Sequence, residues 1–105
     1  MPVHFLVRFE PLPGMEIEFR EELLRVVEPT RTEIGCLAIH VFESLRAPFA
    51  FAIHSEWVDE AAFELHARLP HTVQFLEAAK RLLTNGVNGL RTREIGADIG
   101  ASAAE

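Results

Sequence analysis

The 105-residue sequence contains a single cysteine, no tyrosine and no long hydrophobic run. One thiol cannot form an internal disulfide or a cysteine-based zinc site, and its presence fits a reducing compartment such as the cytoplasm. No segment approaches the roughly 18 consecutive apolar residues of a membrane-spanning helix. The N-terminal segment is already charged at Arg8, which is not typical of a signal peptide. We therefore expect a cytoplasmic protein with no membrane partner.

Basic residues are also in the minority, with 10 Lys and Arg against 16 Asp and Glu and a formal net charge of −6. Nucleic-acid-binding domains usually carry a basic face, so this balance argues against a nucleic-acid partner. No glycine-rich phosphate loop is present, and a nucleotide or flavin site therefore has no support in the sequence. The length predicts one domain, which would bury only about 60–70% of its unfolded surface and would gain stability from a partner subunit.

Hydrophobic periodicity predicts that strands and helices alternate along the chain. Strands are expected over residues 3–10, 36–43, 49–57 and about 90–95, and helices over residues 15–28, 60–69 and 70–83. Pro29 is expected to end or kink the first helix near Glu28. This order is that of an α+β, ferredoxin-like split βαβ fold, with an antiparallel sheet in the order 4-1-3-2 and helices on one face. The predicted domain covers residues 1–95, and residues 96–105 are expected to be a loosely ordered tail.

The alternation along the strands predicts which side chains face away from the helices. On the first strand these are His4, Leu6 and Arg8. On the second strand they are Cys36, Ala38, His40 and Phe42, and on the third they include His54. Leu6 and Phe42 are too apolar for a fully wet surface, so a homodimer through this sheet face is expected.

Two segments, EIGCLAIHVFES and FAFAIHSEWVDEAAFELHARLPHTVQFLEAAKRL, resemble the antibiotic biosynthesis monooxygenase family. The resemblance covers roughly residues 3–95, and its marks are Glu33, Gly35, Cys36, Trp57, Asp59, Ala62, Phe63, His66, Pro70, His71 and Phe75. It implies a dimeric α/β barrel that oxygenates a small electron-rich aromatic, such as a phenol, hydroquinone or anthrone, with no cofactor. A deprotonated substrate of this kind can itself give an electron to O₂, so the protein need supply only a base, orientation and exclusion of water.

A related branch of the family degrades haem, and the resemblance allows that activity to be tested residue by residue. The three positions used by that branch correspond here to Val7, His66 and Leu76. Because leucine cannot be an axial ligand of iron, haem degradation is disfavoured.

His66 and His71 are the candidate catalytic bases, because histidine alone has an unperturbed pKa near neutrality. His66 lies on the inner stripe of its predicted helix, where the alternative is a core-edge histidine bonded to a backbone carbonyl. His71 follows Pro70, where it could equally cap the helix start.

Four aromatic residues are candidates for holding a substrate ring: Trp57, Phe51, Phe63 and Phe75. Each is also what a packed core requires. His4, His40 and His54 fall on three strands and on one sheet face, where they could form a three-histidine metal site or a polar patch inside the dimer barrel. The register decides between the two, and we assign no metal ligand from the sequence.

Two other functional classes stay open beside the monooxygenase. One is a non-catalytic dimer that binds a small hydrophobic ligand or acts as a stress-associated accessory protein. The other is a histidine-dependent isomerase or cyclase on a related barrel, which would shift a proton without using O₂.

Overall fold

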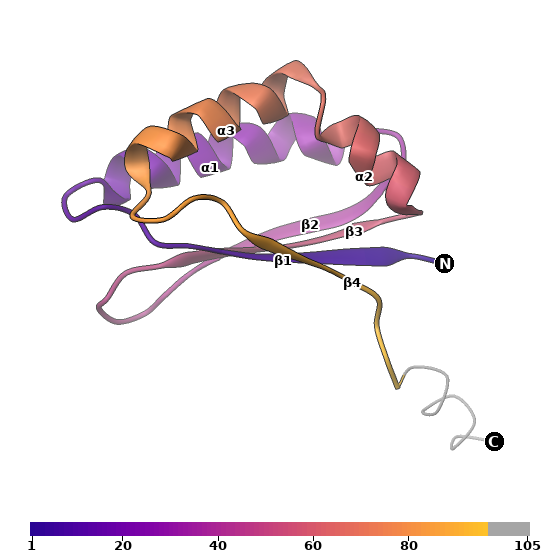
Figure 1. Ribbon diagram of the computed structural model, residues 1–105, viewed down its shortest axis with the longest axis horizontal. Helices are drawn as coiled ribbons and strands as arrows, with labels where there is room; N and C mark the ends of the chain where they lie inside the picture. Colours follow the sequence, from indigo (N-terminus) through magenta and orange to yellow (C-terminus); the bar gives the residue numbers. More distant parts are fainter. Residues whose placement is uncertain (97–105) are drawn as a thin grey trace.

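The computed structural model describes residues 1–96. Within them the elements follow one another in the order β1 (Val3–Phe9), α1 (Glu16–Arg31), β2 (Cys36–Glu43), β3 (Phe51–Trp57), α2 (Glu60–His66), α3 (Pro70–Leu82) and β4 (Gly89–Thr92). All the helices in this range cover one face of the sheet and leave the other face open (Figure 1). The α+β, ferredoxin-like prediction is confirmed. The predicted tail lies, apart from Gly96, outside the described residues.

The sheet has the strand order β2-β3-β1-β4, and every neighbouring pair is antiparallel, as the split βαβ plan predicted. The register pairs Leu6 with His54 and places His54 directly opposite His40. The predicted open-face residues of β1 and β3 therefore lie side by side.

The core fills the space between helices and sheet. Four phenylalanine rings form its centre, with centroid separations between 5.2 and 5.9 Å, and they are Phe9, Phe19, Phe51 and Phe75. Leu23, Val26, Val27 and Leu82 pack around them. Rings in tilted and edge-to-face contact gain attraction beyond the area they bury, and they hold α1 and α3 on the sheet.

The first helix continues past the proline that was expected to end it. Pro29 lies inside α1, which runs to Arg31. The prediction that the helix ends near Glu28 was therefore wrong: the proline removes one hydrogen bond, to the carbonyl of Arg25, and Arg25 lies on the exposed side of the helix. The buried Thr30 hydroxyl donates to the Val26 carbonyl at 2.7 Å and secures the last turn.

Cys36 faces the helices and not the open side. The register pairs Cys36 with Trp57 and Ala38 with Glu56, so Leu37 is an extra residue in a bulge. A bulge shifts side chains before it to the other face, which is why simple alternation misplaced this cysteine. Cys36 packs against the core, and burial raises the pKa of its thiol.

Two strand ends also differ from expectation. β3 begins at Phe51, and Phe49, which was expected to belong to it, is exposed. β4 is short and ends at Thr92.

No helix in residues 1–96 is long and apolar enough to cross a membrane.

Candidate active site

Three segments meet at the end of the sheet where β2 begins and β3 ends. Glu33 lies in the turn between α1 and β2, His66 is the last residue of α2, and His71 is the second residue of α3. Asp59 caps α2 by accepting from the Ala62 amide at 2.8 Å, and Pro70 occupies the first turn of α3. The short break between the two helices allows both histidines to reach the same carboxylate.

Gly35 allows the turn that carries Glu33 to pack closely against α2. Its φ of +94° lies in the left-handed region, and a Cβ at this position would lie 2.7 Å from the Ala62 side chain. A larger residue would therefore meet both backbone strain and a collision. The glycine is a local reason why Glu33 faces the helix pair.

Glu33 accepts a hydrogen bond from each histidine through the same oxygen. Its Oε2 lies 2.8 Å from Nδ1 of His66 and 2.6 Å from Nε2 of His71. An ionised carboxylate can only accept, so both nitrogens must carry hydrogens; in a neutral ring the lone pair then lies on the opposite nitrogen, Nε2 of His66 or Nδ1 of His71. We call Glu33, His66 and His71 the carboxylate–histidine cluster.

The cluster is largely withdrawn from water. The exposed fractions of the Glu33, His66 and His71 side chains are 8, 13 and 24%. Burial lowers the pKa of His66, and its hydrogen bond to Glu33 opposes that effect in part. Burial therefore favours the neutral, proton-accepting form of His66.

Aromatic rings form one side of the cluster. Trp57 is fully buried, with its ring centroid 4.6 Å from that of His66, and Phe63 lies 5.5 Å from His66. The Trp57 indole N–H donates to the Ser55 hydroxyl at 3.0 Å, which fixes the orientation of the ring. Four of the sequence-predicted site residues thus lie together: His66, His71, Trp57 and Phe63.

The other two predicted aromatic residues lie elsewhere. Phe51 and Phe75 are both in contact with Phe19 in the centre of the core. Conversely, Glu33 was noted as a mark of the family resemblance but received no role. Its place just before Gly35 and a strand was a signal for a constrained turn, but its partners lie 33 and 38 residues away in sequence.

The histidines on the open face also lie close together, but there His4 and His54 bond to each other and not to a carboxylate. His4 Nδ1 lies 2.9 Å from His54 Nε2, and the His40 ring lies 6.3 Å from that of His54. We call these three the open-face histidine row. Among residues 1–96, the carboxylate–histidine cluster is the one group of three potential ligands whose atoms lie close enough together to share a metal ion.

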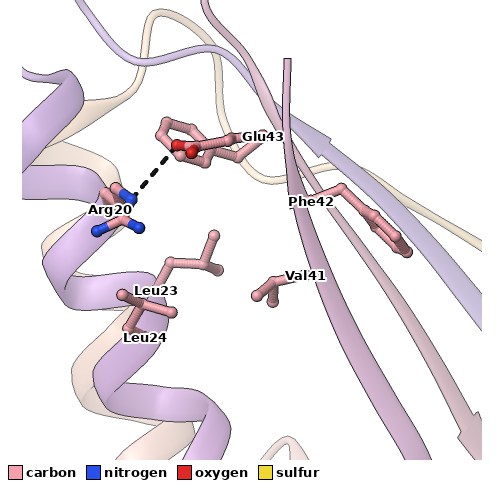
Figure 2. A pocket seen from close by; sticks show the side chains of 7 residues that line it. Arg20, Leu23, Leu24, Val41, Phe42 and Glu43 are labelled. Carbon is pink, nitrogen blue, oxygen red and sulfur yellow. Dashed lines mark hydrogen bonds and ion pairs between the residues drawn. The ribbon is translucent and has the colours of Figure 1, made fainter. Parts of the chain in front are cut away.

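Several surface hollows lie away from the cluster. One, of about 120 Å³, is lined by Arg20, Leu23, Leu24, Val41, Phe42, Glu43 and Phe51. It opens between α1 and β2, where Arg20 donates to Glu43 at 3.3 Å (Figure 2). Another, of about 370 Å³, lies on the open face of the sheet and is lined by Leu6, Val7, Arg8, Phe42, Ala52, Ile53, His54, Asn88 and Leu90. We call this second one the open-face hollow; His54 is part of its lining, which is mainly apolar.

Comparison with known proteins gives this geometry a context. A family model described as antibiotic biosynthesis monooxygenase matches residues 2–78. The solved structure of Rv0793 from Mycobacterium tuberculosis is 25% identical, with a TM-score of 0.84 over 90% of this chain and 96% of that one. PA3566 from Pseudomonas aeruginosa is 26% identical, with a TM-score of 0.83 over 90% and 94%.

A curated relative, the uncharacterised protein sll1783 of Synechocystis, is 28% identical over 71 residues. The match covers 68% of this chain and 48% of the relative, so the chain spans about half the length of that protein.

Proposed function

The chain belongs to the antibiotic biosynthesis monooxygenase family, and on that premise we propose that it oxygenates a small electron-rich aromatic or quinol with O₂ and no added cofactor. The observation that carries the proposal is the Glu33 carboxylate, which holds two histidines beside Trp57 and Phe63. The lone, partly buried Cys36 is consistent with a reducing, cytoplasmic location.

His66 is the proposed base. Glu33 accepts from its Nδ1, so the opposite nitrogen, Nε2, keeps the lone pair that can take a proton. This is the arrangement in which a carboxylate fixes the tautomer of a catalytic imidazole and stabilises the imidazolium that forms. Proton transfer of this kind contributes about 10²- to 10⁴-fold to a rate.

His71 is the proposed positioning residue, since it occupies the same carboxylate oxygen from the opposite helix. Together the two hydrogen bonds prevent Glu33 from rotating. Phe63 would hold the substrate ring by stacking, and the fully buried Trp57 would support the His66 ring from behind.

The reaction balances without an external reductant. His66 removes a proton from the substrate hydroxyl or its tautomeric CH₂, and the resulting anion transfers an electron to O₂. Recombination forms a C–O bond, the O–O bond then breaks, and a CH₂ becomes C=O while its two hydrogens leave in water with the second oxygen atom. The substrate loses four electrons and O₂ gains four.

A homodimer through the open sheet face is part of the proposal. Leu6, Phe42 and Leu90 are 46, 57 and 65% exposed on this face, and a second copy would remove these apolar side chains from water. A second copy would cover the open-face histidine row as well. Sedimentation of wild type and Phe42→Glu tests this point: the wild type should sediment as a dimer and the variant as a monomer.

A second candidate function rests on the open-face hollow. Its volume of about 370 Å³ and mainly apolar lining suit a small hydrophobic ligand bound without chemistry. In that case a hydrophobic probe would bind at Leu6 and Leu90, and substitutions in the carboxylate–histidine cluster would leave its affinity unchanged.

Oxygen uptake with a panel of hydroquinones and anthrones tests the oxygenase. His66→Ala should lower the uptake rate by about 10²-fold or more, and His71→Ala should lower it less, while His40→Ala serves as a control at the wild-type rate. Equal rates in all variants, or no uptake in any, would remove the proposed roles. Substrate consumption without O₂ uptake would instead favour an isomerase.

A further inference from the structure

We propose that the carboxylate–histidine cluster binds one divalent transition-metal ion, with zinc as the representative, and that the bound ion inhibits the site. The inference goes beyond the proposed oxygenation. Metal binding rests on the geometry of three side chains, whereas its inhibitory consequence rests on the proposed function of His66.

The three ligand atoms are already close to coordination geometry. His66 Nδ1, His71 Nε2 and a Glu33 oxygen all lie within 4.8 Å of one another. Zinc bonds to nitrogen and oxygen are about 2.0–2.2 Å long, so tetrahedral ligands stand about 3.3 Å apart. The Glu33 oxygen now lies 2.8 and 2.6 Å from the two nitrogens. To admit the ion, the Glu33 oxygen would have to move away from each nitrogen by roughly half an ångström or more, and the two nitrogens would have to stand about 3.3 Å apart as well.

The ligand types suit a borderline transition metal and not calcium or magnesium. Imidazole nitrogen is a preferred ligand of zinc, copper, iron and nickel, whereas calcium and magnesium prefer oxygen. Two histidines and one carboxylate leave a fourth position for water, which is the pattern of an open zinc site. The ligands come from a turn and two helices, so three separate parts of the chain constrain them.

The charge of Glu33 also favours a cation. The carboxylate is 8% exposed, and within residues 1–96 no lysine or arginine forms an ion pair with it. Its partners there are the two histidines, which compensate its charge only when one of them is protonated. A buried carboxylate without a fixed positive partner is costly, and a divalent ion would remove that cost.

The metal-bound and hydrogen-bonded states exclude each other. The ion takes a lone pair from His66 Nδ1, where the hydrogen bond to Glu33 now requires a hydrogen. The ring hydrogen must then lie on Nε2, and the nitrogen proposed as the base loses its lone pair. Metal binding would therefore switch off proton abstraction without any change of fold.

Calorimetric titration of untagged, EDTA-treated and dialysed full-length protein with Zn²⁺ tests the proposal. We expect one ion per chain. Binding should be at least about tenfold weaker in His71→Ala and Glu33→Gln, because even the loss of a group that only hydrogen-bonds to a metal ligand lowers metal affinity about 10- to 100-fold. His40→Ala is the matched control and should bind as the wild type does. Circular dichroism establishes that each variant is folded.

Cobalt provides a second measurement that does not depend on how well a variant folds. Co²⁺ added to the wild type should produce visible absorption of a tetrahedral or five-coordinate ion, and Zn²⁺ should displace it. Absence of binding to the folded wild type would overturn the proposal and leave a hydrogen-bonded cluster only. Loss of binding in His40→Ala but not in His71→Ala would also overturn it, because the ion would then lie on the open-face histidine row.

The two proposals can fail separately. If Zn²⁺ binds as expected but no substrate of the panel is oxygenated, the metal site stands and the oxygenase falls. If oxygenation occurs and Zn²⁺ does not bind, the reverse holds. When both are observed, O₂ uptake should fall in proportion to site occupancy; uptake unchanged at full occupancy would contradict the inhibitory role.

Discussion

The molecule carries histidines on both faces of its sheet, and the two groups differ in what receives their hydrogen bonds. In the carboxylate–histidine cluster, one buried oxygen of Glu33 accepts from two rings. In the open-face histidine row, His4 and His54 bond to each other at 2.9 Å, so one ring must donate and the other accept. A carboxylate fixes the tautomer of both its partners, whereas a histidine pair can reverse its roles. The comparison teaches that the acceptor and its burial, more than the residue type, suit a histidine for chemistry.

The largest difference between the two faces is expected from their aromatic residues. Trp57→Ala should lower the free energy of unfolding by about 3–5 kcal/mol, because it leaves a cavity under His66. Phe42→Ala on the open face is the matched control and should cost within about 0.5 kcal/mol in the monomer. Urea unfolding of both variants measures the difference. A cost for Phe42→Ala that grows with protein concentration would report the dimer, and equal costs in dilute monomer would contradict the burial contrast.

Removal of the carboxylate should have the next largest effect. Glu33→Ala leaves two partly buried ring N–H groups without their acceptor and should cost about 1–3 kcal/mol in the free energy of unfolding. Glu33→Gln should cost less, because the amide oxygen still accepts.

Glu56 provides the control for this substitution, since it lies opposite His4 in the register on the open face. Glu56→Ala should change the unfolding free energy by about 0.5 kcal/mol or less. If Glu56→Ala were as costly as Glu33→Ala, the two carboxylates would be equivalent and the contrast between the faces would disappear.

A smaller effect concerns pH. Burial depresses the pKa of His66 in the folded protein below its unfolded value of about 6.5. The unfolded chain therefore binds the proton first as the pH falls. Stability should be fully present above about pH 6.5 and decline as the pH falls toward the folded pKa, by at most about 1.4 kcal/mol per pH unit for this group.

Unfolding free energies of wild type and His66→Gln would isolate this contribution. They should be measured between about pH 5 and pH 8, a range that extends at least one unit on either side of the ordinary histidine pKa. The variant should show a smaller decline, whereas His40→Gln should keep the decline because it retains His66. An unchanged decline in His66→Gln would show that another group is responsible.

Local patterns predicted the fold well because strand alternation and helix periodicity report burial directly. They placed Leu6 and Phe42 on the open face, as the structure has them. Cys36 was misplaced because a bulge adds one residue, a change that leaves no mark on the alternation of a short strand.

The site was less predictable, since its contacts join residues far apart in sequence. Helix periodicity indicated that His66 faces inward, but nothing local could show that Glu33 is its partner. Phe51 and Phe75 were candidates for ring binding on the same grounds as Phe63, yet both pack against Phe19 in the core. Distinguishing a core aromatic from a site aromatic requires the three-dimensional neighbours.

The smallest expected effect tests the hydrogen bonds themselves. A double-mutant cycle of His4→Ala and His54→Ala should give a coupling energy of about 0.5–1.5 kcal/mol, typical of a bond between neutral groups. The same cycle for Glu33 and His71 should give about 1.5–3 kcal/mol, because that bond involves a charged acceptor and is largely buried. Urea unfolding of the single and double variants at one protein concentration supplies both values. A coupling on the open face equal to that of the cluster would mean that a histidine acceptor holds its partner as firmly as Glu33 does, and the proposed reason for placing the chemistry at the cluster would fail.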